Sequence, residues 1–143
     1  MSHLSTIDVK LDSLDALKKA LEEMGYGYVE GTRTMRTMYG QSTTVELQVK
    51  RDNKELPVGF RTTNNSDYEL VADWWGLGIN SDKFANDVRA YHAKHKLVDT
   101  ATSKGFKLED SRWVEHEGKQ MLQVTLGSWD GGKTFGTDFG SGW

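Results

Sequence analysis

Four consecutive strand-like stretches lie between two helix-like stretches. Of all the features of the sequence, this order most restricts the possible folds. Strands that follow one another without an intervening helix pair as antiparallel hairpins, because a parallel pair needs a long crossover connection. One strand-like stretch precedes the first helix and two follow the second. We therefore predict an α+β domain, an antiparallel sheet with two helices packed on one face, in the order β-α-β-β-β-β-α-β-β.

The N-terminal part gives the clearest local pattern. Apolar and charged residues alternate over 7–11, which is typical of a half-buried strand. Asp12 or Ser13 then stands where the N-cap of a helix is expected. The predicted helix ends near Gly25 and carries one apolar face, formed by Leu14, Leu17, Leu21 and Met24.

The later elements are assigned from composition and turn residues. The four strand-like stretches between the helices cover about 26–38, 45–50, 58–60 and 68–75. Ser81 is the expected cap of a second helix, which runs to Gly105. One stripe of this helix carries Phe84, Val88, Tyr91 and His95. The last two strands are predicted at about 106–115 and 120–126.

The composition changes at Gly127. The last 17 residues contain six glycines and show neither strand nor helix periodicity. We therefore predict one domain over 1–126, followed by a Gly- and aromatic-rich tail, 127–143, that is flexible and dispensable for folding. Within it, 127–134 matches the P-loop pattern G-x-x-x-x-G-K-[ST]. A P-loop needs a following helix to hold phosphates, and the glycine-rich remainder offers none, so we interpret the match as a coincidence.

Composition excludes several classes of protein. The chain has 143 residues and no cysteine, which excludes disulfides, thiolate metal sites and a cysteine nucleophile. No apolar run approaches the roughly 20 residues that span a bilayer, and the N-terminus lacks the features of a secretory signal, so we expect a cytoplasmic protein. The net charge of −3 argues against nucleic acid as a partner.

His92 and His95 are three residues apart on the second predicted helix, a spacing at which two imidazoles can share a metal ion. The sequence places no third ligand beside them, so we interpret both as surface histidines and predict neither a metal nor a cofactor. No G-x-S-x-G motif is present, and we identify no catalytic residue.

Arg33, Arg36, Tyr39 and Gln41 form the first candidate binding segment. The two arginines are the only charged residues between Glu30 and Glu46, just before a glycine at which the backbone can turn. Guanidinium groups beside an amide and a phenol suit a phosphate, a carboxylate or an acidic loop of a partner. The alternative is that the arginines pair with the acidic stretch 67–82 of the same chain.

Asp73 and Trp75 are further candidate binding residues. Adjacent side chains of a strand point to opposite faces, so Trp74 and Trp75 cannot both be buried under the same helix. One of the two indoles is therefore either under a helix or an exposed contact.

Several short motifs, in order along the chain, resemble one family. They lie at 1–7, 15–21, 36–41, 58–60, 68–73 and 105–106. The chain resembles the hypothetical chloroplast open reading frame thirty-five family, with a similarity that spans about 1–126. The resemblance implies no activity, cofactor or catalytic residue. It implies an origin in bacteria, plastids or phages, hence bacterial cytoplasm, plastid stroma or infected-cell cytoplasm. Bacterial members tend to be encoded near AAA-type ATPases, which implies an adaptor role.

Two functions follow as hypotheses. The first is a non-enzymatic interaction or adaptor module that binds a protein partner, by family context an AAA-type ATPase. The alternative is a binder of a small anionic ligand, such as a nucleotide, through Arg33, Arg36, Tyr39 and Gln41. An exposed apolar patch around Trp75 favours the first hypothesis, and a concave pocket where the four side chains converge favours the second.

Overall fold

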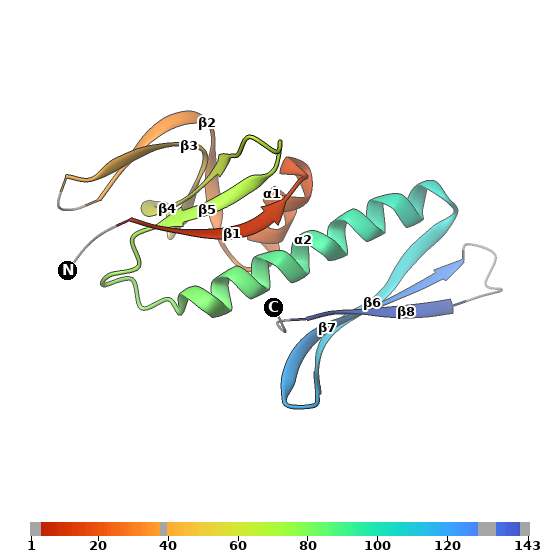
Figure 1. Cartoon of the computed structure of the whole chain (residues 1–143). Coiled ribbons are helices and arrows are strands. Elements are labelled where there is room, and N and C mark those ends of the chain that lie inside the picture. The colour runs from red at the N-terminus through yellow and green to blue at the C-terminus, as the bar shows by residue number, and fades with distance from the viewer. Residues whose placement is uncertain (1–3, 38–39, 129–133, 141–143) are drawn as a thin grey trace.

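The fold has the predicted class and the predicted order of its first nine elements (Figure 1). The computed structural model describes residues 4–37, 40–128 and 134–140. The elements are β1 (Ser5–Leu11), α1 (Leu14–Glu23), β2 (Gly27–Arg36), β3 (Ser42–Arg51), β4 (Lys54–Thr62), β5 (Tyr68–Ala72), α2 (Ser81–Ser103), β6 (Phe106–His116), β7 (Lys119–Ser128) and β8 (Thr134–Gly140).

The strands form two antiparallel sheets, where we expected one. The first has the order β1-β5-β4-β3-β2, and the second has the order β6-β7-β8. The reason is the length of α2, whose 23 residues extend for about 35 Å and carry the chain past the first sheet. Figure 1 shows α2 running from the five-stranded sheet to the three-stranded one. Neither helix of the described ranges is long and apolar enough to cross a membrane.

The main core lies between the two helices and the five-stranded sheet. Leu17 and Leu21 of α1 are fully buried, as the predicted apolar face requires, and they belong to one cluster with Phe84 and Val88 of α2 and Phe60 of β4. Burying each such side chain contributes about 1.5–3 kcal/mol. A second core joins α2 to the three-stranded sheet through Ala90, Ala101, Leu122, Val124 and Leu126.

The β2–β3 hairpin bends over the sheet. A bulge between Glu30 and Arg33 contains Gly31, whose φ of +117° is open to glycine but strained for other residues. At the far end, the Leu4 N–H donates to Gln41 Oε1 at 2.9 Å, so the hairpin reaches the start of the opposite edge strand. A small cluster of Met35, Val45, Val71 and Leu4 fills the space beneath the bend.

The C-terminal segment contains a strand that its sequence does not indicate. Thr134–Gly140 forms β8, which pairs with β7 from Met121 to Gly127. Residues 129–133, which carry most of the P-loop match, lie outside the described residues. The flexibility and dispensability of 127–143 stay predictions.

The two helices are also joined by polar contacts, and one expectation for this region is wrong. We expected His92 at the surface, but its side chain is buried, with 5% of its area exposed. Its Nε2 accepts the N–H of Ser13 at 3.2 Å, and Ser13 is the N-cap of α1. Nearby, the buried Lys94 lies 2.6 Å from Glu23 Oε2, and Lys96 lies 2.7 Å from Asp12 Oδ1.

The buried imidazole makes stability depend on pH. Burial lowers the pKa of His92 from its ordinary value of 6.5; Lys96 and His95 lower it further, while Asp12 partly opposes the shift. As pH falls, the unfolded chain therefore takes up this proton before the folded chain does, which favours unfolding. We expect the melting temperature to fall as pH drops below about 6.5, and less steeply in His92→Gln, whose amide oxygen can still accept from Ser13.

The measurement is calorimetry from about pH 7 to about pH 5, with His116→Gln as the control because His116 is exposed on β6. A His92→Gln profile parallel to that of the wild type would contradict this assignment.

Candidate functional site

The structure separates the two candidate arginines. Arg33 Nη2 lies 2.7 Å from Glu55 Oε1 of β4, so its partner is not the acidic stretch 67–82 that the alternative expected. Met35 is buried, and Arg36 lies on the opposite face of β2 from it. Arg36 is exposed, and within the described ranges no carboxylate pairs with it. Only Arg36 of the pair is therefore available to a ligand without breaking an existing ion pair.

Gln41 fixes the tip of the β2–β3 hairpin, and Tyr39 lies outside the described residues. The N–H of Thr37 donates to the carbonyl oxygen of Gln41 at 2.8 Å, and the N–H of Gln41 donates to Thr37 Oγ1 at 3.2 Å. The side-chain oxygen of Gln41 binds Leu4, as described above. Gln41 is thus a structural residue of the tip.

Asp73 and Trp75 belong to one hydrogen-bonded turn after β5. The carboxylate of Asp73 is buried and accepts the N–H of Trp75 at 3.2 Å, while the N–H of Asp73 donates to the Pro57 carbonyl oxygen at 2.9 Å. The turn continues with Leu77 N–H to the Trp74 carbonyl oxygen at 3.2 Å. Trp74 packs on Phe84 of α2, with ring centroids 5.5 Å apart, whereas Trp75 is 54% exposed.

The hairpin tip and the tryptophan turn are connected through the start of β1. Leu4 contacts Gln41, and the next residue, Ser5, donates its hydroxyl to the Ala72 carbonyl oxygen, directly before Asp73. In Figure 1 the tip of the hairpin, the start of β1 and the β5–α2 connection lie on the same side. We call Arg36, Gln41 and Trp75 the corner surface.

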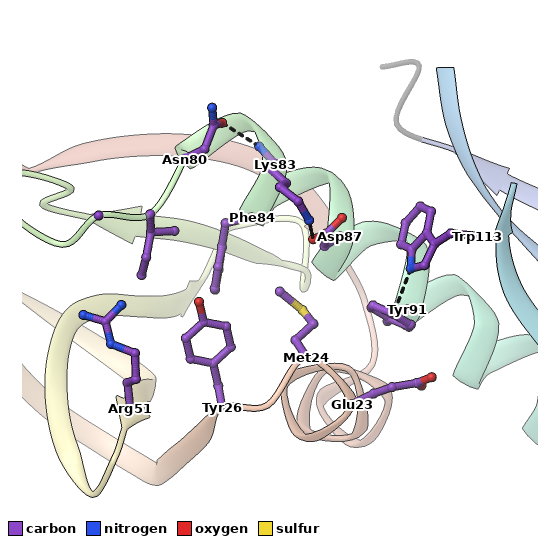
Figure 2. Close-up of a pocket in the computed structure, with 12 residues that line it drawn as sticks. Glu23, Met24, Tyr26, Arg51, Asn80, Lys83, Phe84, Asp87, Tyr91 and Trp113 are labelled. Carbon is purple, nitrogen blue, oxygen red and sulfur yellow. Dashed lines mark hydrogen bonds and ion pairs between the residues drawn. The ribbon is translucent and has the colours of Figure 1, made fainter. Parts of the chain in front are cut away.

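A cavity of about 480 Å³ lies along α2 (Figure 2). Its walls come from the end of α1, from Tyr26 directly before β2, from the end of β3, from residues 78–80 of the β5–α2 connection, from the first turns of α2, and from β6. A second cavity of about 480 Å³ shares Lys83, Asp87 and Trp113 with it. The first cavity has aromatic walls, formed by Tyr26, Phe84, Tyr91 and Trp113.

The aromatic side chains of this cavity hold one another in place. The rings of Tyr26 and Phe84 meet edge to face, with centroids 5.4 Å apart. The rings of Tyr91 and Trp113 do the same at 5.7 Å, and Trp113 Nε1 donates to the Tyr91 hydroxyl at 2.8 Å. Paired in this way, the rings form fixed flat surfaces that suit stacking.

Sequence reasoning missed this cavity because its walls are distant in the chain. Tyr26 and Trp113 are predicted only as strand residues, and Arg51 falls just after the strand predicted at 45–50. These positions are far apart in the sequence and form no recognisable motif, because only the packing of α2 beside the end of β3 brings them together. Among the described residues, no group of three His, Asp or Glu side chains is arranged to hold a metal ion. The cavity wall is equipped for stacking and ion pairing.

Comparison with known proteins identifies the family. A family model described as "Protein of unknown function (DUF1257)" matches residues 20–122, most of the chain, so the chain belongs to this family. It is similar to a protein described as "Uncharacterized protein ycf35" from Cyanophora paradoxa, 27% identical over 132 residues, which are 90% of this chain and 98% of the relative. A ycf35 protein of Pyropia yezoensis is 27% identical over 113 residues, 75% of this chain and 84% of that relative. These matches confirm the resemblance to the reading frame thirty-five family. No solved structure is significantly similar to the chain.

The exposure of Arg36 gives a stability prediction. Because its guanidinium has no ion pair within the described ranges, Arg36→Ala should change the free energy of unfolding by less than about 0.5 kcal/mol. Arg61→Ala is the contrasting variant, because Arg61 binds Glu69 and Thr43 across neighbouring strands. It should cost about 1–3 kcal/mol. Urea denaturation measures both, and an equal loss in the two variants would make Arg36 part of the scaffold.

Proposed function

We propose that this member of the DUF1257 family is a non-enzymatic adaptor that binds a protein partner through the corner surface. The observation that carries the proposal is the 54% exposure of Trp75. Large exposed aromatic side chains are typical of interaction sites, and tryptophan and arginine are enriched among the residues that dominate binding energy. Trp75 and Arg36 supply both types at one corner.

The turn that carries Trp75 supports this role. Its backbone is held by the buried Asp73 carboxylate and by the contact of Asp73 with Pro57. A side chain presented on a fixed backbone loses less conformational entropy on binding than one on a loose loop. Asp73 therefore acts as a positioning residue in this proposal, and Trp75 as the contact.

The partner we propose is an AAA-type ATPase, since bacterial members of the reading frame thirty-five family tend to be encoded near such enzymes. A suitable partner surface has an apolar pocket for the indole and a carboxylate near it for Arg36. We propose bacterial cytoplasm or plastid stroma as the compartment. Nucleic acid does not suit the chain, whose net charge is −3.

The test is titration calorimetry with the purified ATPase encoded beside a bacterial member. Trp75→Ala should weaken binding by about 2 kcal/mol or more, roughly thirtyfold in Kd. Leu108→Ala is the matched control, because Leu108 is also a large exposed apolar residue, 40% exposed, but lies on β6. It should leave Kd unchanged. Equal binding by the two variants, or no binding by the wild type, would refute the proposal.

A small anionic ligand such as a nucleotide at Arg33, Arg36, Tyr39 and Gln41 is the second candidate function. This candidate is favoured by Arg36, whose guanidinium is exposed and has no carboxylate partner within the described ranges. The ion pair of Arg33 with Glu55 opposes it, because an anion would have to compete with that carboxylate. Loss of nucleotide binding in Arg36→Ala, with Trp75→Ala unaffected, would favour this candidate over the first.

A further inference from the structure

We propose that the cavity along α2 is a second binding site, for a small organic anion that carries an aromatic ring. In this assignment Arg51 receives the anionic group and the aromatic walls receive the ring. The site is distinct from the corner surface, and none of the candidate residues predicted from the sequence lines it. The inference rests on the charge balance of the cavity, on the support of Arg51 and on the arrangement of the rings.

The charge balance leaves one positive charge without a partner. The side chains of four charged residues line the cavity: Glu23, Arg51, Lys83 and Asp87. Lys83 Nζ lies 2.6 Å from Asp87 Oδ2, and Glu23 is bound by the buried Lys94 at 2.6 Å. In the part of the chain that the structure describes, no carboxylate lies within ion-pair distance of Arg51. An anion is the occupant that completes this set.

The guanidinium of Arg51 is held in position. It is half-buried at the end of β3, and Nη1 donates to the Leu77 carbonyl oxygen at 3.2 Å. The guanidinium of Arg51 has five N–H donors, and its contact with Leu77 uses only one of them. The remaining N–H groups can donate to a carboxylate or a phosphate. An arginine fixed by the protein and only partly hydrated binds an anion more strongly than one on an open surface.

The two ends of the cavity differ in chemistry. In Figure 2, Arg51 and Tyr26 lie at one end, with the Tyr26 hydroxyl directed away from its own backbone, while Trp113 and Glu23 lie at the other. No hydrogen bond of the Tyr26 hydroxyl to another described residue is present, so it can donate to the same anion. An occupant therefore lies with its charged group near Arg51 and its ring toward Tyr91 and Trp113.

The size and the walls fit a ring-bearing molecule. About 480 Å³ is within the range of pockets that hold small organic ligands, roughly 300–1,000 Å³. The edge-to-face pairs Tyr26–Phe84 and Tyr91–Trp113 keep ring faces and edges at fixed angles, of 72° and 87°. A planar ligand ring can pack against such surfaces without reordering them.

The test uses two anionic probes with their neutral counterparts, measured by titration calorimetry on the full chain. Adenosine 5′-monophosphate against adenosine is the phosphate arm, and indole-3-acetate against indole is the carboxylate arm. In the arm that matches the natural ligand, the anion should bind at least tenfold more tightly than its neutral counterpart. Arg51→Gln should remove this preference, and Arg51→Lys should keep part of it. Arg112→Gln is the matched control, because Arg112 is exposed and pairs with Asp110 on β6.

The location is read from NMR spectra of the five indole N–H groups. The signal of Trp113, assigned with Trp113→Phe, should shift on binding, because its N–H is bonded to Tyr91 in the cavity wall. The signal of Trp75 at the corner surface should not move. A shift of Trp75 alone would place the ligand at the corner instead and overturn this proposal.

Two other outcomes also overturn it. One is that neither anion binds at millimolar concentration. The other is that Arg51→Gln, folded as judged by near-UV circular dichroism, binds the anions as tightly as the wild type does. Neither outcome affects the adaptor proposal, whose test depends on Trp75 and a protein partner.

Discussion

Helix α2 has to bury apolar side chains on two sides at once. Phe84 and Val88 pack against the five-stranded sheet, while Ala90 and Ala101 pack against the three-stranded one. One side of α2 covers the five-stranded sheet and another side covers the three-stranded sheet. Both cores therefore depend on the position of the same helix. The contacts that fix α2 against α1, above all His92 on Ser13 and Lys94 on Glu23, therefore position both halves of the molecule. The cavity along α2 exists because the helix is shared.

The polar contacts between α1 and α2 determine how the two helices are aligned more than how strongly they bind each other. A buried lysine is costly to desolvate, and its attraction to a carboxylate offsets that cost only with good geometry. Lys94 has such geometry, at 2.6 Å from Glu23 and with its ammonium 5.8 Å from the ring centre of Tyr91. Sliding α2 by one turn would separate Lys94 from Glu23 and leave a buried charge alone. The same geometry holds Tyr91 where it meets Trp113.

How far the sequence predicts this structure depends on how local each feature is. The face of α1 and its Ser13 cap follow from neighbouring residues, and both are confirmed. The buried side of α2 was only partly predicted, because a helix that is buried on two sides lacks a single apolar stripe. His92 was interpreted as a surface residue for this reason. The glycines of β8 hide its pairing, and the division into two sheets depends on contacts that no window contains. At the corner, one indole is under a helix and the other is exposed, as expected, but Trp74 and Trp75 lie in the turn after β5 and not on the strand predicted over 68–75. Arg51 and Trp113 meet only in the folded chain.

The bend of the β2–β3 hairpin has a consequence for association between copies. The five-stranded sheet has two open edges, β1 and β2, and a straight edge offers unpaired N–H and C=O groups to strands of other molecules. The bulge at Gly31 breaks the line of β2, and the contact of Gln41 with Leu4 draws the tip of the hairpin across to β1. The edge of β2 thereby loses the straight stretch on which a strand of another copy would add, and the pairing of β1 is itself irregular between Ile7 and Leu11. Such irregular edges disfavour edge-to-edge pairing between copies of the chain.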